Sequence, residues 1–256
     1  MLKKFVIKRI LCFIAATAVM AMSSCAKPES TDSLFHGTVG AVYKTDEYDI
    51  AESYAQNGAT VEGYESDDDV FFALENGKVD VVIADEFEAY SRLLENNRYE
   101  IKTECTATKS FCVYFAKNSD LCSEFNEAIS YLKANGVIEK IRKSHLEGTK
   151  YNAPVPESKK GTLVLVTDAS NAPYPFEYED SKGNITGIDL DIAKEICSYL
   201  GYGLEIKSVD FDELFTSLDE GNADFIMSAA TVTEERLEYY SASDEYFLMH
   251  YEAVGF

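Results

Sequence analysis

A nine-residue pattern that occurs twice decides the fold. It reads Ala73-Leu-Glu-Asn-Gly77-Lys-Val-Asp-Val81 in the first half of the chain and Ser217-Leu-Asp-Glu-Gly221-Asn-Ala-Asp-Phe225 in the second, and Gly221 lies 144 positions after Gly77. In each copy an amphipathic helix ends at a glycine, and an aspartate then opens a buried strand. The pattern predicts an α/β protein with two similar lobes. The alternative is chance recurrence of a turn that is common in α/β proteins.

Outward from this pattern, strand-like and helix-like segments alternate, which is typical of α/β units with mostly parallel sheets. The predicted strands are residues 38–43, 79–84, 99–104, 111–116, 162–167, 204–209, 225–228 and 246–256. The predicted helices are residues 46–56, 67–75, 86–94, 119–132, 137–145, 190–200, 211–218 and 233–238. Residues 149–160 include Pro154 and Pro156 and have the composition of a linker, so we expect a domain boundary there.

The composition bounds the class of protein. Of the 256 residues 46% are hydrophobic, which is enough for a packed core and excludes global disorder. The chain has 23 Lys and Arg against 45 Asp and Glu, a net charge of -22. Because such a field repels phosphate groups, we expect no nucleic-acid partner.

The first 25 residues have the pattern of an export signal. Lys3, Lys4, Lys8 and Arg9 precede an apolar stretch at residues 10–22, which is short for a membrane span. The stretch ends in small residues directly before Cys25, and this order resembles the bacterial lipoprotein signal, in which the cysteine is lipidated after cleavage. Residues 26–33 then form a tether. The alternative is an ordinary signal peptide with an incidental cysteine.

The cysteines and histidines indicate no metal site. After Cys12 and Cys25, the chain has Cys105, Cys112, Cys122 and Cys197, and these four show neither Cys-x-x-Cys pairing nor metal-ligand spacing. We expect no metal and no cofactor. Buried free thiols are the favoured state, and a disulfide between Cys105 and Cys112 stays open in an extracytoplasmic protein.

Five short motifs in the second half carry a family resemblance. They are Gly161–Asp168, Pro175–Tyr178, Gly187–Ala193, Val209–Phe211 and Thr231–Arg236, in that order. Together they resemble the first lobe of the extracellular solute-binding proteins of polar amino-acid ABC transporters, family 3, over residues 161–256. Residues 34–148 resemble the second lobe with its C-terminal helices. The resemblance implies the two-lobed periplasmic-binding-protein type 2 fold.

The order of the lobes is reversed relative to that family. The chain therefore looks circularly permuted, with residues 149–160 joining the family's usual C-terminus to its usual N-terminus. Chain ends of a domain often lie close together, which makes permutation physically tolerable. Two alternatives are open, a remnant of a tandem array and a dimer that exchanges lobes.

The resemblance assigns the groups that hold an amino acid. Arg236 is the clamp for the ligand carboxylate, which its planar guanidinium fits in a bidentate manner, and Thr231 lies beside it. Asp85 takes the ligand ammonium with the carbonyl of Ala229. The alternatives are a surface Arg236 that pairs with Glu234 or Glu235, and an Asp85 that only caps the helix after it.

The ligand side chain is assigned to four further residues. Phe211 and Tyr174 match the apolar walls, although composition alone would place Phe211 in the core. Asp168 matches a position that touches the ligand side chain, and Ser228 lies at the end of its strand facing the same cleft. No catalytic residue is expected.

One stretch departs from the family. The family has a Gly-Thr-rich turn for the ligand carboxylate at a helix N-terminus, and here the sequence is Tyr43-Lys-Thr-Asp46-Glu47-Tyr. Two acids would repel a carboxylate, so binding is either weakened, directed to a cationic side chain, or lost.

These observations predict a lipid-anchored binding protein on the extracytoplasmic face of a bacterial membrane. It would capture an amino acid, polar or cationic by preference, and pass it to an ABC permease. A sensory or partner-binding lipoprotein and a degenerate copy are the alternatives. The chain has no GxSxG, HExxH, Walker A or GxGxxG sequence, so we do not expect an enzyme.

Overall fold

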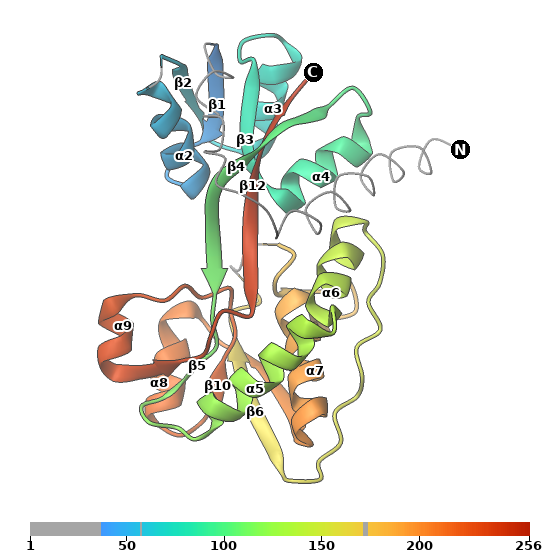
Figure 1. The fold of residues 1–256 in the computed structure, drawn as a ribbon, viewed down its shortest axis with the longest axis vertical. Helices are drawn as coiled ribbons and strands as arrows, with labels where there is room; N and C mark the ends of the chain where they lie inside the picture. The colour runs from blue at the N-terminus through green and yellow to red at the C-terminus, as the bar shows by residue number, and fades with distance from the viewer. Residues whose placement is uncertain (1–36, 57, 171–173) are drawn as a thin grey trace, which may run out of the picture. The chain divides into compact units, whose positions relative to one another are not determined.

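The computed structural model describes residues 37–56, 58–170 and 174–256 (Figure 1), and they form two compact units. Unit 1 consists of the described residues up to Thr108 together with His250–Phe256. Unit 2 consists of the described residues of Lys109–Met249. The predicted signal, Cys25 and the tether at residues 26–33 lie outside the described residues and stay predictions.

Unit 1 is a mixed sheet with helices, built largely from residues before Thr108. Its strand order is β2-β1-β3-β12-β4, with β1 parallel to β2 and β3, and β12 antiparallel to β3. The strands are β1 (Thr38–Val42), β2 (Thr60–Tyr64), β3 (Val81–Asp85), β4 (Glu100–Phe111) and β12 (Phe247–Gly255). The helices are α2 (Asp46–Ala55), α3 (Asp67–Glu75) and α4 (Glu86–Glu95).

Unit 2 has a second five-stranded sheet. Its strand order is β11-β5-β10-β6-β9, with β6 parallel to β9 and β10, and β5 antiparallel to β10 and β11. The strands are β5 (Tyr114–Ala116), β6 (Thr162–Thr167), β9 (Gly203–Ser208), β10 (Phe225–Ile226) and β11 (Tyr240–Ala242), and the hairpin is β7 (Tyr178–Glu179) with β8 (Ile185–Thr186). The helices are α5 (Leu121–Ala134), α6 (Val137–Leu146), α7 (Ile188–Leu200), the 3-10 turn η2 (Phe211–Glu213), α8 (Leu214–Asp219) and α9 (Glu234–Tyr239). The predicted α/β class is confirmed, whereas the expectation of mostly parallel sheets is wrong, since both sheets combine parallel and antiparallel pairs of strands.

The repeated pattern forms the same corner in both units. Gly77 follows α3 with φ +65°, and Gly221 follows α8 with φ +71°. This left-handed conformation favours glycine because a side chain there meets its own backbone. Both glycines end their helices as predicted, and each is followed by a strand that has a parallel neighbour.

The aspartate of each corner fixes the start of its strand to the neighbouring strand. In unit 1, Asp80 donates its N–H to the Thr38 carbonyl at 2.8 Å, and its Oδ2 accepts the Thr38 N–H at 2.7 Å. In unit 2, Asp224 donates to the Val164 carbonyl at 2.9 Å and accepts the Val164 N–H at 2.7 Å. The predicted similarity of the two halves therefore extends to individual hydrogen bonds.

The main difference from the predicted elements is β4. Residues 99–104 and 111–116 were expected as two strands, and the structure has a single strand of 12 residues at Glu100–Phe111, followed by the short β5. The intervening residues 105–110 contain no Gly, Pro, Asn or Asp that would break a strand. Strand β12 lies beside β4 in the sheet and supplies its pairing (Figure 1). The chain passes between the units within these two strands.

The predicted boundary at residues 149–160 falls inside unit 2. Helices α5 and α6 precede this segment and pack against α7, which follows it. The imidazole Nε2 of His145 lies 3.2 Å from Asp191 Oδ2, and the Tyr151 hydroxyl donates to Glu195 at 2.6 Å. The compact units divide near Thr108 and Met249, and the role of residues 149–160 as the link between two lobes stays a prediction.

The four described cysteines are free thiols. Cys105, Cys112 and Cys197 are buried, and Cys122 is half-buried. Burial raises the pKa of Cys105 and of Cys112 to about 11, so both stay protonated and inert at neutral pH. In the part of the chain that the structure describes, no helix has both the length and the apolarity that a membrane crossing requires.

Candidate functional site

The ends of two parallel strands in unit 2 bring Asp168 and Ser228 together. Asp168 directly follows β6, and Ser228 follows β10 by two positions. Both side chains are buried, and the Asp168 N–H donates to Ser228 Oγ at 3.1 Å. The carboxyl ends of parallel strands are where α/β proteins place ligand groups. The predicted neighbourhood of these two residues is thus present in the structure.

Ala229 continues this edge in an unusual conformation. Its φ is +42°, in the left-handed region that few residues other than glycine adopt. Its N–H donates to Asp189 Oδ2 at 2.8 Å. Strained backbone conformations that the surrounding structure holds in place cluster at functional sites. The contact of the Ala229 carbonyl with a ligand ammonium stays a prediction.

Arg236 lies in helix α9. Thr233 is the N-cap of this helix, and its hydroxyl oxygen accepts the Arg236 backbone N–H at 3.2 Å. Its Nη1 donates to the Thr231 carbonyl at 2.9 Å. Within the described residues the guanidinium pairs with no carboxylate, so the alternative of a pair with Glu234 or Glu235 is not what the structure has.

Three aromatic rings surround the Arg236 guanidinium. Its central carbon lies 5.1 Å from the ring centroid of Phe215 and 5.8 Å from those of Phe211 and Tyr114. The Tyr114 hydroxyl donates to the same Thr231 carbonyl at 2.7 Å. Cation–π contacts and one carbonyl hold a guanidinium without neutralising it. Arg236 therefore keeps donors for an anion, while the Thr231 carbonyl is already occupied.

The two predicted wall residues are accessible. Phe211 is 46% exposed at the start of η2, and Tyr174 is 70% exposed, with its ring 4.9 Å from that of Tyr178. Composition alone would have placed Phe211 in the core, and the structure contradicts that placement. Neither ring is committed to internal packing, so both are free to contact a small molecule.

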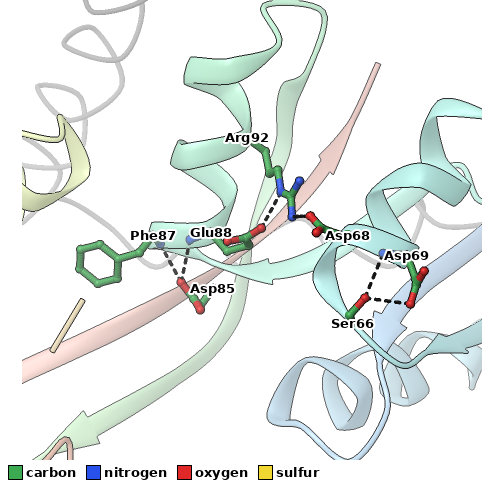
Figure 2. A network of polar contacts seen from close by, with 7 residues as sticks. All are labelled: Ser66, Asp68, Asp69, Asp85, Phe87, Glu88 and Arg92. Carbon is green, nitrogen blue, oxygen red and sulfur yellow. Dashed lines mark hydrogen bonds and ion pairs between the residues drawn. The ribbon is translucent and has the colours of Figure 1, made fainter. Parts of the chain in front are cut away.

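Asp85 belongs to unit 1 and ends strand β3. Its Oδ1 accepts the N–H groups of Phe87 at 2.7 Å and Glu88 at 3.0 Å, which makes it the N-cap of α4 (Figure 2). Burial raises the pKa of Asp85 to about 7, with the nearby Glu47 charge adding to the shift. The capping role is confirmed, and ammonium binding stays a prediction. Seven of the eight predicted ligand residues lie in unit 2 and Asp85 in unit 1.

Arg92 of α4 holds the surroundings of Asp85 in place. Its guanidinium contacts Glu88 on its own helix and Asp68 on α3, each at 2.6 Å (Figure 2). Ser66 caps α3 by accepting the Asp69 N–H at 3.2 Å. In contrast to Arg236, the charge of Arg92 is fully paired, so its role is to tie two helices together.

Asp46 and Glu47, the two acids in the stretch that differs from the family's Gly-Thr-rich turn, lie in unit 1, as Asp85 does. Asp46 and Glu47 form the first turn of α2 after the cap Thr45, and Asp46 Oδ2 accepts the Tyr251 hydroxyl at 3.0 Å. Burial and the Glu47 charge raise the pKa of Asp67 as well. The N-termini of α2, α3 and α4 in unit 1 are thus rich in acidic residues. Among the described residues no group of three or more His, Cys, Asp or Glu is arranged to hold a metal ion.

Two buried acids were missed as functional candidates. Glu177 and Asp189 are fully inaccessible, and Ser228 Oγ donates to Glu177 Oε1 at 2.6 Å. Both lie inside motifs that carry the family resemblance, flanked on either side by apolar residues. Each acid has an apolar residue on both sides, but further acids follow two positions later, so the sequence carries no clear signal that these two are buried.

Comparison with known proteins gives one family match. Residues 163–254 match the model of the bacterial extracellular solute-binding proteins, family 3. A probable histidine-binding protein of Neisseria gonorrhoeae is 38% identical over 97 residues, which are 38% of this chain and 35% of that protein. The arginine-binding extracellular protein ArtP of Bacillus subtilis is 35% identical over 99 residues, which are 39% of this chain and 38% of that protein.

A third relative is an enzyme by name. The membrane-bound lytic murein transglycosylase F of Desulfosudis oleivorans is 35% identical over 86 residues, 34% of this chain and 18% of that protein. The chain spans little more than a third of the two binding proteins. The permuted lobe order stays a prediction, whereas the resemblance stated from the motifs is confirmed. Residues 163–254, little more than a third of the chain, are therefore similar to the bacterial extracellular solute-binding proteins of family 3.

Proposed function

We propose that this chain binds an amino acid and that Arg236 holds the ligand carboxylate. One observation carries the proposal. Arg236 is oriented by the Thr231 carbonyl and three aromatic rings, and its charge is left without a carboxylate partner among the described residues. An oriented guanidinium is suited to bidentate carboxylate recognition, and it lies in the segment that matches the solute-binding family.

The ligand that we favour is polar or cationic. Asp46 and Glu47 place two acids in the first turn of α2 in unit 1. A carboxylate would be repelled there, while an ammonium or guanidinium would be attracted. The relatives named for histidine and arginine support this choice.

Titration calorimetry of the full-length chain in detergent with each of the twenty amino acids tests the proposal. We expect heat with arginine, histidine or another polar amino acid, and none with aspartate or glutamate. A folded sample that gives neither heat nor a thermal shift with any of the twenty would reject amino-acid binding and favour the degenerate copy.

Delivery to a membrane permease extends the proposal. We expect a lipid at Cys25, a tether over residues 26–33 and an extracytoplasmic location, with release of the ligand to an ABC permease. Mass spectrometry of the membrane fraction would detect the lipid, and Cys25→Ala should release the chain from the membrane. A Cys25→Ala chain that stays membrane-bound would contradict the anchor.

The permuted lobe order belongs to the same proposal. Residues 34–148 would act as the family's second lobe with its C-terminal helices, residues 149–160 as the connecting linker, and residues 161–256 as the first lobe. An exchange of lobes between two copies is the competing arrangement. Light scattering decides between them, because a swapped protein has the mass of a dimer.

A sensory lipoprotein of the same fold is the second candidate. It would use the same Arg236 and differ only in its partner, a receptor in place of a permease. Binding of an amino acid without any effect of gene deletion on its uptake would favour sensing. We do not propose an enzyme, since the match to the transglycosylase covers 18% of that protein.

A further inference from the structure

Unit 2 contains two fully buried acids that form an ion pair with no described Lys, Arg or His. Glu177 precedes strand β7, and Asp189 lies in the first turn of α7. Both side chains have an exposed fraction of 0%. The ion pairs among the described residues include neither of them. A buried, unpaired carboxylate is so costly that such groups usually become neutral.

The hydrogen bonds of the two carboxyl groups are complementary. Ser228 Oγ donates to Glu177 Oε1 at 2.6 Å, and the Ala229 N–H donates to Asp189 Oδ2 at 2.8 Å. The two carboxyl groups are close enough for each to influence the pKa of the other. With both groups ionised, Glu177 Oε2 and Asp189 Oδ1 have no donor among the described residues. One proton between these two oxygens satisfies both.

In the described part of the chain, the groups near the pair offer no compensating positive charge. Asp168 lies near Glu177, and the Tyr246 hydroxyl, which is itself buried without a hydrogen-bond partner among the described residues, lies near Asp189. Cys112 lies near Tyr246. Burial, and then the charge of Asp189, raise the pKa of Glu177, and burial raises the pKa of Asp189. Two adjacent carboxylates without a cation cannot both ionise at neutral pH.

We propose that Glu177 and Asp189 share one proton and that this protonated pair positions Ser228 and Ala229 at the edge of the candidate ligand site. The role in ligand binding rests on the proposed function, whereas the shared proton does not. Glu177 and Asp189 are positioning residues, because they act through the Ser228 hydroxyl and the Ala229 N–H. The strained φ of +42° at Ala229 is the feature that needs such a support.

Infrared spectroscopy of the full-length chain tests the shared proton directly. At about pH 7, the wild-type protein should show the C=O stretch of a protonated carboxyl group that Glu177→Gln lacks. A matched control is Glu252→Gln, because Glu252 of unit 1 is also buried and burial raises its pKa to about 8. Glu252→Gln should remove the band of the Glu252 carboxyl group and leave the band assigned to Glu177 in place. Spectra of wild type and Glu177→Gln without any difference in this region would overturn the proposal.

The variants are chosen so that a folding failure does not end the test. The amide that Glu177→Gln introduces would still donate toward Asp189 and accept from Ser228, so this variant should fold. If it does not, 13C labelling of glutamate in the Glu252→Gln background decides. The protonated C=O band should shift with the label, and a band that stays unshifted would overturn the assignment to Glu177.

Two readouts test the positioning role. In NMR spectra, Glu177→Gln should leave the Ala229 amide signal close to its wild-type position and slow to exchange, while Glu177→Ala should move it and speed its exchange. Affinity for L-arginine should follow the same order, with less than about twofold loss in Glu177→Gln and about tenfold loss in Glu177→Ala. Equal damage in both variants would overturn the proposal, since it would mean that the ionised carboxylate is needed. If L-arginine does not bind the wild type, the proposed ligand fails and the amide signal alone decides the positioning.

Discussion

The corner between α3 and β3 and the corner between α8 and β10 share a backbone and differ in the residues after the strand. Both have a left-handed glycine and an aspartate bonded twice to the neighbouring strand. After β3, Asp85 caps a helix at once. After β10, Ala229 turns with φ +42°, and α9 begins only at Glu234. The repeated residues determine the shared backbone conformation, and the residues after each strand determine which functional groups lie at its end.

The arginines that follow the two corners in sequence, Arg92 and Arg236, also differ in their partners. Arg92 beside the first corner is paired with Asp68 and Glu88. Arg236 beyond the second is surrounded by rings and one carbonyl. A paired arginine contributes to stability, while an unpaired one remains available to an anion. Four predictions test this contrast.

The largest effect is expected from Arg236→Ala. Loss of a bidentate carboxylate contact should weaken amino-acid binding by about 2–5 kcal/mol and change the unfolding free energy little, because Arg236 pairs with no described carboxylate. Calorimetry and urea unfolding measure the two quantities. Arg92→Ala is the matched variant, and it should lower stability by about 1 kcal/mol while disturbing affinity far less. Equal affinities of wild type and Arg236→Ala would remove Arg236 from the site.

The second effect is a pH dependence in unit 1. The folded-state pKa of Asp85 is raised to about 7, above the value of 3.8 for the free side chain. Folding therefore favours the protonated form, and the contribution of Asp85 to stability is full below about pH 4 and is lost as the pH rises through about 7.

Asp85→Asn isolates this contribution. Asparagine can still cap α4 and carries no charge, so above pH 7 the variant should be more stable than the wild type, on the order of 2 kcal/mol. Denaturant unfolding between about pH 4 and pH 8 checks it. A variant less stable than the wild type at every pH would show that the charged carboxylate is favoured, contrary to the raised pKa.

The third effect concerns the two glycines. An added Cβ meets nothing within 4 Å at either Gly77 or Gly221, so alanine there is disfavoured by the backbone alone. We expect Gly77→Ala and Gly221→Ala each to lower the unfolding free energy by about 1–2 kcal/mol. Chemical denaturation of both variants measures this. Losses that differ by more than a factor of two would break the equivalence of the corners.

The smallest expected effect is the difference in stability loss between substitutions of Asp80 and of Asp224. Asp224 accepts a partly buried N–H, and Asp80 accepts an exposed one. Because water can replace the exposed contact, Asp80→Ala should lower stability by about 0.5 kcal/mol and Asp224→Ala by about 1 kcal/mol or more. The same unfolding experiment checks the order. A greater loss in Asp80→Ala would contradict the role of burial.

Local signals determine how much of the fold could be predicted. Gly77, Gly201 and Gly221 each end a helix where predicted, because a left-handed glycine leaves a clear mark in sequence. Strand β2 was missed because none of its residues Thr60–Tyr64 is fully buried and only Val61 and Tyr64 are apolar, which leaves a weak signal. Strand β11 was missed because its three residues are held by pairing with β5, a contact distant in sequence.

The candidate site was predicted unevenly for similar reasons. Arg236, Asp168 and Ser228 could be placed because they lie at fixed positions in recognisable motifs. The rings of Phe215 and Tyr114 around Arg236 could not, since Tyr114 precedes Arg236 by more than a hundred residues and only the fold brings them together. The pair of Glu177 and Asp189 was missed because sequence shows charge and does not show burial.

The position of the segment at residues 149–160 has a consequence for cleavage. It has no regular structure, its Val155 is 89% exposed, and the helices on either side of it in sequence belong to unit 2. A protease that cut there would give two fragments, one ending after α6 and the other beginning before β6. Because α5 and α6 would still pack on α7, the nicked protein should stay associated until denaturant is added. New chain ends at this position could carry a fluorescent reporter without interrupting any helix or strand of unit 2.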